Sequence, residues 1–206
     1  MMKKRLLSII VIALISINAI AQEESNDFNK WQARLRVIAI IPDVDDDLNA
    51  AKVDVSTAVV PELDFTYFFD ENWAAELILA TAKHNVDVDL GTGIDLGHVW
   101  ILPPTLSLQY HFTGGTVKPY LGAGINYTFF YGIDEGDVDA MDYEDAVGFS
   151  MQGGLDFDLN DYWFLNVDLK KLLLKTDVEV DTGEGVIPVE VDLNPWIIGV
   201  GIGVKF

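Results

Sequence analysis

The histidines and serines of this chain are its candidate catalytic side chains, and their spacing decides whether they could bind a metal or form a nucleophile–base pair. The histidines are His84, His98 and His111, the chain has no cysteine, and no histidine stands at metal-ligand spacing from another. A serine mechanism needs a nucleophile, a base and an orienting group within reach of one another. Ser107 and His111 would share one face of a strand, but we expect that face to be buried and remote from any lipid-accessible mouth. The sequence therefore predicts no enzyme activity, no catalytic residue, no metal site and no cofactor.

Three aspartates could instead bind a cation. Asp43, Asp45 and Asp47 alternate like the start of a calcium loop, but the turn glycine and the twelfth-position glutamate are missing. We therefore favour a diffuse role, in which acidic loops bridge divalent cations to the phosphates of lipopolysaccharide.

The elements that would position these residues are strands. At the carboxyl end of the chain, every second residue is apolar: Trp196, Ile198, Val200, Ile202, Val204 and Phe206. The intervening residues are small or polar: Gly199, Gly201, Gly203 and Lys205. Successive side chains of a strand point to opposite faces, so this strand has one large apolar face and one small or polar face. A closed barrel in lipid requires that pattern.

The remainder of the chain repeats the pattern. Eight alternating segments have about the length that a tilted transmembrane strand needs. They cover residues 31–41, 57–69, 73–83, 104–112, 118–130, 146–159, 162–176 and 193–206. Short polar turns at 70–72, 113–117 and 160–161 alternate with longer, mostly acidic connections after residues 41, 83, 130 and 176. The sequence predicts an all-β, eight-stranded antiparallel transmembrane barrel with both termini in the periplasm.

The amino terminus reads as an export signal. Residues 1–21 contain a basic stretch, an apolar run too short to span a bilayer as a helix, and an Ala-x-Ala cleavage site. We expect residues 1–21 to be removed and residues 22–206 to form the barrel in the cell outer membrane. The formal net charge is −20, and loss of three basic residues with the leader makes it −23. Such acidity argues against nucleic acid as a partner, since phosphates would be repelled.

The inward parity of the segments divides the predicted lumen into two levels. Near the termini we expect a polar plug of paired charges, formed by Arg34, Arg36, Glu62, Asp64, Glu76, His111 and Asp168. Toward the far end the inward positions are apolar and would form a vestibule: Ile38, Ile40, Val60, Ile78, Phe130, Leu172, Leu174 and Ile197. The lumen of an eight-stranded barrel holds side chains or one small ligand, so this lining decides function. The vestibule could bind an apolar ligand that leaves sideways into the bilayer, or its residues could simply pack as a dry core.

Four stretches resemble the OmpW family of small outer-membrane barrels. They are LPPTLSLQYHF at 102–112, KPYLGAGINYTFF at 118–130, NDYWFLNVDLKKL at 160–172 and DLNPWIIGVGIGVKF at 192–206. Two departures are the ending Gly203-Val204-Lys205-Phe206, where an aromatic residue and Arg are more usual, and the Lys170-Lys171 pair before three leucines. The resemblance implies a narrow hydrophobic channel that passes small apolar molecules, and a terminal strand read by the outer-membrane assembly machinery.

The sequence thus predicts a barrel that binds small hydrophobic molecules in its apolar vestibule and passes them across the lipopolysaccharide barrier. Its other expected partners are the lipid bilayer and lipopolysaccharide. The alternative is a structural or stress-response barrel, or a receptor, that acts through its acidic extracellular loops without transport.

Overall fold

The structure is a computed structural model that describes residues 29–46, 52–89, 93–136, 140–181 and 185–206. The predicted export signal at 1–21 lies outside the described residues, as does Asp47. Among the residues described, no helix is long and apolar enough to cross a membrane.

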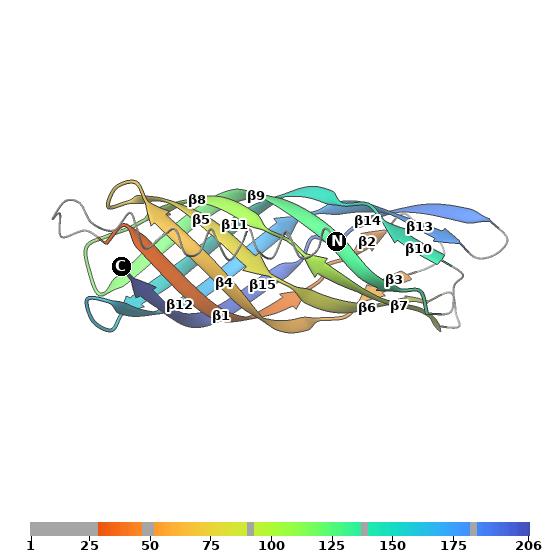
Figure 1. Cartoon of the computed structure of the whole chain (residues 1–206), viewed down its shortest axis with the longest axis horizontal. Helices are drawn as coiled ribbons and strands as arrows, with labels where there is room; N and C mark the ends of the chain where they lie inside the picture. Colours follow the sequence, from red (N-terminus) through yellow and green to blue (C-terminus); the bar gives the residue numbers. More distant parts are fainter. Residues whose placement is uncertain (1–28, 47–51, 90–92, 137–139, 182–184) are drawn as a thin grey trace, which may run out of the picture.

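Eight antiparallel strands close into a barrel, as the sequence predicts (Figure 1). Around the barrel the order is β11-β12-β15-β1-β4-β5-β8-β9, and pairing of β9 with β11 closes the ring. The strands are β1 (Trp31–Ile41), β4 (Ala58–Phe68), β5 (Trp73–Ala80), β8 (Thr105–His111), β9 (Val117–Asp134), β11 (Ala146–Asp158), β12 (Trp163–Leu173) and β15 (Trp196–Lys205). The terminal strand β15 pairs with both β1 and β12, so the last strand of the chain meets the first.

The alternation of the sequence becomes the two faces of this wall. On β15 the side chains of Trp196, Ile198, Val200 and Ile202 are exposed on the outer surface, whereas its glycines face the lumen. The same alternation holds on β9 and β11, where outward Leu121, Ile125, Val147, Phe149 and Met151 are each about 60% exposed. An apolar outer face over a polar interior is the arrangement that a barrel in lipid requires.

The two ends of the barrel differ, and we call them the terminal end and the distal end. The terminal end carries Phe206 and the short turns at 69–72, 112–116 and 159–162. Side chains fix two of these turns. Asp70 accepts hydrogen bonds from the backbone N–H groups of Asn72 and Trp73 at 2.8 and 2.7 Å. These bonds lower the pKa of Asp70. Asn160 accepts hydrogen bonds from the backbone N–H groups of Tyr162 and Trp163, both at 2.9 Å. Exposed aromatic rings surround this end: Trp31, Trp73, Phe112, Tyr162 and Trp163.

The sequence predicts long loops for the connections at the distal end, and this prediction is wrong, because they are largely strands. They contain β2 (Asp45–Asp46), β3 (Lys52–Val55), β6 (Ala82–Asp89), β7 (Gly93–Leu102), β10 (Ala140–Tyr143), β13 (Lys175–Asp181) and β14 (Val186–Asp192). The predicted segments 73–83 and 162–176 are correspondingly each divided, at Thr81 and Leu174. The acidic residues alternate with valines here, and this two-residue period supports strands as well as solvated charge.

These strands form an extension that continues the barrel beyond its distal end (Figure 1). β3, β6 and β7 join β9, whereas β10, β13, β14 and β2 form a separate sheet. The apolar faces of both groups meet in one core, built from Val86, Leu96, Val99, Met141, Val178, Val189 and Val191. The extension therefore has an apolar interior that is in line with the lumen.

Close approach of β15 to β1 gives a first prediction. A Cβ added at Gly201 would lie against Leu35 O and 2.7 Å from Arg36 Cα, both backbone atoms of β1 that cannot move without disturbing the ladder. We expect Gly201→Ala to lower the free energy of unfolding by about 1–3 kcal/mol. Urea titration in lipid vesicles, followed by tryptophan fluorescence, measures it.

Gly115 is the matched control, because an added Cβ there would meet nothing nearer than Val117 O at 3.9 Å. Equal stability of Gly201→Ala and Gly115→Ala would contradict the assigned β1–β15 packing.

Candidate functional site

Two buried arginines organise the interior of the barrel. Arg34 and Arg36 lie two residues apart on β1 and point inward, each 1% exposed. The antiparallel register places Asp64 opposite Arg34 and Glu62 opposite Arg36 on β4. On the other side of β1 the facing residues are Gly203 and Gly201, which leave room for the guanidinium groups.

Arg34 holds the acidic residues of three strands. Its Nε lies 2.7 Å from Asp64 Oδ1, and Nη2 donates to Thr66 Oγ1 at 2.8 Å and to Glu76. Nη1 is 3.8 Å from Asp156 Oδ1 on β11. The ring of Tyr120 lies 5.5 Å from the Arg34 guanidinium carbon, at cation–π distance.

Arg36 extends the network toward β12. Its Nε lies 2.7 Å from Glu62 Oε1 and its Nη2 2.8 Å from Asp64 Oδ2. Nη1 donates to Asn166 Oδ1 at 3.2 Å and is 3.8 Å from Asp168 Oδ2. Tyr120 donates to the same Asp168 oxygen at 2.7 Å.

The network carries more acid than base. Its cations are Arg34, Arg36 and Lys170, whose Nζ is 3.4 Å from Glu62 Oε2. Its carboxylates are Glu62, Asp64, Glu76, Asp156 and Asp168. Buried charges are tolerated only when they are paired and hydrogen-bonded, because desolvation of each costs several kcal/mol. The predicted plug residues therefore do come together, and a charged ligand would have to displace several ion pairs to pass them.

His111 joins the same network through amides. Its Nε2 lies 2.9 Å from Gln109 Oε1, and Gln109 Nε2 donates to Glu76 Oε2 at 2.7 Å. The imidazole is flanked by the rings of Phe68 and Tyr120, with centroids 4.8 and 5.0 Å away. The Ser107 hydroxyl has no hydrogen-bond partner among the described residues, so Ser107 and His111 do not form a nucleophile–base pair. The described residues also include no cluster of three or more metal-ligating side chains.

The terminal end opens into a polar mouth of about 970 Å³. Its lining includes His111, Asp156 and Asp158. Lys118 and Lys205 both pair with Asp158, the former at 2.7 Å. The mouth thus leads from solvent to the underside of the charged network.

Above the network, the predicted vestibule is an apolar compartment. Ile38, Ile40, Leu172 and Ile197 form one buried cluster with Val60 packed against it. An adjoining cavity of about 50 Å³ is lined by apolar side chains, together with Thr128 and His84. Its walls include Ile40, Leu172, Leu174 and Ile197. We call this space the barrel cavity.

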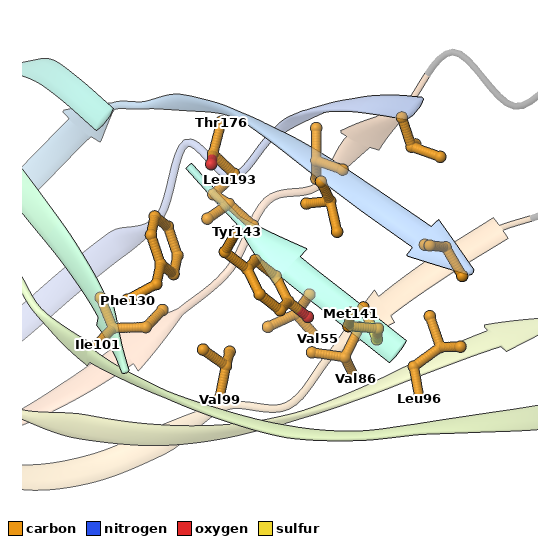
Figure 2. A pocket seen from close by; sticks show the side chains of 14 residues that line it. Val55, Val86, Leu96, Val99, Ile101, Phe130, Met141, Tyr143, Thr176 and Leu193 are labelled. Atoms are coloured by element: carbon orange, nitrogen blue, oxygen red, sulfur yellow. The ribbon is translucent and has the colours of Figure 1, made fainter. Parts of the chain in front are cut away.

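A second apolar cavity, of about 70 Å³, occupies the extension. Figure 2 shows Phe130, Tyr143, Val86, Leu96 and Met141 converging on it from both groups of strands. The Phe130 ring stacks on Tyr143 with centroids 5.3 Å apart. Burial raises the pKa of Tyr143 to about 12. We call this space the extension cavity.

The two cavities are neighbours. Val55, Ile101 and Leu193 line both, so one layer of side chains divides them. Neither reaches the ~150 Å³ of a protein cavity known to take up benzene. Displacement of the shared wall would join them into one apolar space of that order.

Four predicted vestibule residues do not line the barrel cavity. Ile38 and Val60 belong to the adjoining buried cluster, whereas Phe130 and Ile78 lie elsewhere. Phe130 lines the extension cavity. Ile78 is buried, but its cross-strand neighbours are Asp64 and Thr105, which places it at the level of the charged network. Strand tilt explains the difference, because equal positions along two strands need not have equal heights.

Three groups of site residues escaped the sequence-based assignment. Lys170 is two residues from the inward Asp168, and Tyr120 is two residues from the inward Gly122. The alternation alone therefore predicts that both side chains point into the lumen. The extension valines alternate with acids at 86–88, 178–180 and 189–191, and this period was the available signal. Gln152, which donates to Glu76 Oε2 at 2.5 Å, has the same inward parity.

A closed eight-stranded barrel with an apolar outer belt and a charged interior is a transmembrane barrel of the outer-membrane type. The family of the chain follows from comparison with known proteins. The chain belongs to the OmpW family, whose family model matches residues 32–206. This finding confirms the resemblance seen in the sequence.

Individual relatives agree with that assignment. The outer-membrane protein y4mB of Sinorhizobium fredii is 39% identical over 85% of this chain and 80% of its own length. PahQ of Pseudomonas aeruginosa, named as a dibenzothiophene metabolism operon protein, is 32% identical over 69% of both chains. The crystal structure of the outer membrane protein OprG from Pseudomonas aeruginosa matches with a TM-score of 0.80 at 28% identity, covering 88% of this chain and 99% of OprG.

The protein is therefore an outer-membrane barrel embedded in the lipid bilayer, as the sequence predicts.

The charged network yields a second prediction. Arg36→Met removes the cation from Glu62 and Asp64 and leaves their charges buried without it. We expect the free energy of unfolding to fall by about 3–5 kcal/mol. Unfolding by urea in vesicles at constant pH measures the change.

Lys175→Met provides the control. Lys175 is half exposed and pairs with Glu190 and Asp192 in the extension, where solvent screens the charges. We expect little change there, and losses of equal size in the two variants would count against the network as a structural centre.

Proposed function

We propose that the protein binds small hydrophobic molecules in the apolar compartment and passes them across the outer membrane. The observation that carries this proposal is the pair of adjoining apolar cavities set above a charged network. An ordinary water-filled lumen is polar along its length. An apolar ligand gains free energy by leaving water for such cavities, at about 25 cal/mol per Å² of apolar surface buried.

The name of one relative supports the chemical class of ligand. PahQ is named for a dibenzothiophene metabolism operon. Dibenzothiophene is an apolar aromatic molecule, so uptake of molecules of this class accounts for an apolar compartment in a related barrel.

The direction of passage follows from the proposed orientation. We place the terminal end in the periplasm and the extension outside the cell, because outer-membrane barrels have short periplasmic turns and longer extracellular connections. A ligand would then enter through the extension cavity, cross the layer of Val55, Ile101 and Leu193, and reach the barrel cavity. The ion pairs of Arg34 and Arg36 lie below and oppose further descent.

The exit that we propose is lateral, through a seam between β5 and β8. Pairing of these strands ends at Ile78 and Thr105, and β6 and β7 resume the same register at Ala82 and Ile101. The residues between them include Pro103 and Pro104, which lack the N–H groups that a ladder requires. Ala80 and Pro103, on opposite sides of the seam, both line the barrel cavity.

Other passages from barrel to extension are bridged by hydrogen bonds. Leu172 N donates to Pro195 O at 3.1 Å, and Leu193 N donates to Leu174 O at 2.9 Å. Asp43 N donates to Leu193 O at 3.1 Å. The seam at Pro103 and Pro104 is crossed by the side-chain contact of Thr81 with the Tyr131 hydroxyl at 2.5 Å, and we propose that it is the weaker part of the wall beside the cavity.

A second candidate function rests on the surface of the extension. Asp177, Glu179 and Glu190 alternate outward on β13 and β14 and are exposed. A structural or stress-response barrel, or a receptor, could act through these acids without transport, with divalent cations bridging them to lipopolysaccharide phosphates. We also propose that the apolar outer face of β15 is the signal for the outer-membrane assembly machinery.

Filling the barrel cavity tests the binding role. Leu172→Trp places a larger side chain in a cavity of about 50 Å³ and should reduce uptake of dibenzothiophene to near the rate of cells without the protein. Uptake is followed by the fluorescence of the compound in cells that express each variant, after heat-modifiable gel mobility has verified folding.

The neighbouring Leu173→Trp is the control, because Leu173 faces lipid and is 43% exposed. Normal uptake by a folded Leu172→Trp variant would favour the structural or receptor role.

Cross-linking the seam tests the lateral exit. The pair Ala80→Cys and Pro103→Cys stands at facing register positions, and a disulfide there should slow uptake until a reductant is added. The pair Leu77→Cys and Leu106→Cys lies in the hydrogen-bonded part of the same wall and should leave the rate unchanged. If oxidation of the seam pair has no effect while uptake is normal, the exit lies elsewhere.

A further inference from the structure

Three inward polar atoms on β8 and β11, beside the charged network, lack hydrogen-bond partners among the described residues. Among the described residues, the hydroxyls of Ser107 and Ser150 and the side-chain carbonyl of Gln152 make no hydrogen bond. Ser107 is 1%, Ser150 2% and Gln152 5% exposed. A buried polar atom without a partner has lost its hydration and gained no hydrogen bond in return, so its retention calls for an explanation.

The three atoms lie on neighbouring strands of one wall. Ser107 on β8 and Ser150 on β11 both stand opposite Gly124 on β9, and Gln152 follows two residues after Ser150 on the same face. A Cβ at Gly124 would come within 2.5 Å of Ser107 Oγ, so this hydroxyl reaches over the glycine toward Ser150. We call Ser107, Ser150 and Gln152 the serine shelf.

The shelf adjoins the barrel cavity. Ser150 stands directly opposite Leu172, whose side chain is part of the cavity wall. On its other side the shelf meets the network, because Gln152 Nε2 donates to Glu76 Oε2 and leaves only Oε1 unpaired. Ser107 stands opposite Glu76 and Gln152 opposite Lys170, so the shelf lies at the level of the charged network. A ligand in the barrel cavity that extends past Leu172 would reach the shelf first at Ser150.

We propose that the serine shelf binds a single hydroxyl group at the end of an otherwise apolar ligand. This inference rests on the proposed binding function and narrows its ligand class to small apolar alcohols and phenols. The shelf provides two hydroxyls that can donate and one carbonyl that accepts, which matches a hydroxyl with two lone pairs and one proton. The apolar remainder of the ligand lies in the barrel cavity.

Charged end groups fit the shelf less well. A carboxylate would lie beside Glu76, in a network whose carboxylates already outnumber its cations. An ammonium group would have to lose its hydration while crossing two apolar cavities, which is costly for an unpaired charge. A neutral hydroxyl avoids both costs.

The test compares toluene with benzyl alcohol, which differ by one hydroxyl. Binding to the full chain in lipid nanodiscs is measured from methyl NMR shifts of Ile40, Ile197 and Leu172, with empty nanodiscs correcting for partition. We expect the double variant Ser107→Ala and Ser150→Ala to bind benzyl alcohol about two- to tenfold more weakly, as the net loss of one hydrogen bond predicts. Toluene should bind as tightly or more tightly. Thr113→Ala, in an exposed terminal-end turn, should change neither affinity.

The outcomes separate the shelf from the wider function. If wild-type protein binds both compounds and the serine variants leave benzyl alcohol unaffected, the shelf inference is wrong and the binding function stands. Equal weakening of toluene and benzyl alcohol would assign the serines a structural role and also overturn the inference. Failure of the wild-type protein to bind either compound would remove the proposed function itself.

Discussion

The structure depends on one constraint, which is that backbone N–H and C=O groups inside a lipid bilayer must find partners within the protein. Strands satisfy it only when the sheet closes, and here the pairing of β9 with β11 completes the ring. Closure fixes two environments on every strand. Outward positions meet lipid and are apolar, whereas inward positions share a lumen too narrow for anything but side chains or one small ligand. The alternation of the sequence follows from this geometry.

The interior then has to be filled, and two arginines on the first strand decide how. Arg34 and Arg36 draw carboxylates from β4, β5, β11 and β12 into one buried network. An apolar ligand cannot enter such a network without breaking ion pairs, and each displaced ion would be left buried without its partner. Two residues further along β1, Ile38 begins the apolar compartment. The abrupt change from charge to hydrocarbon along one strand gives the lumen a closed floor and a space above it.

The two-residue alternation of apolar and polar residues predicts most of the fold and part of the candidate site. The eight barrel strands, the short turns at the terminal end and the inward residues of β1 all follow from a two-residue repeat. The extension is not predictable from this pattern alone, because Val178, Val180, Val189 and Val191 alternate with acids, and acids fit a solvated loop as well as the outer face of a strand. The alternation also shows which side chains point into the lumen, but not how far along the barrel axis they lie. The sequence therefore predicts Ile78 in the vestibule, whereas it lies beside the charged network. Hydrogen-bond partners such as Tyr120 for Asp168 depend on side-chain reach across the lumen, and no pattern along one strand contains that information.

The same backbone constraint makes Pro103 and Pro104 informative. Two prolines in a lipid-facing wall remove donors from the ladder, and their carbonyls would be left exposed to hydrocarbon if nothing compensated. Asn126 compensates from the inside: its amide nitrogen lies 3.1 Å from Pro103 O and 3.4 Å from Pro104 O, and it also reaches Thr105 Oγ1 at 2.9 Å. Asn126 and the backbone N–H of Tyr127, which donates to Pro104 O at 3.1 Å, thus hold the two prolines to β9. From the other side of the seam, the Thr81 hydroxyl meets the Tyr131 hydroxyl at 2.5 Å, a side-chain contact in place of a backbone ladder. A wall held in this way satisfies its polar groups while closed and has fewer backbone bonds to break on opening. That combination is what a lateral passage beside an apolar cavity requires.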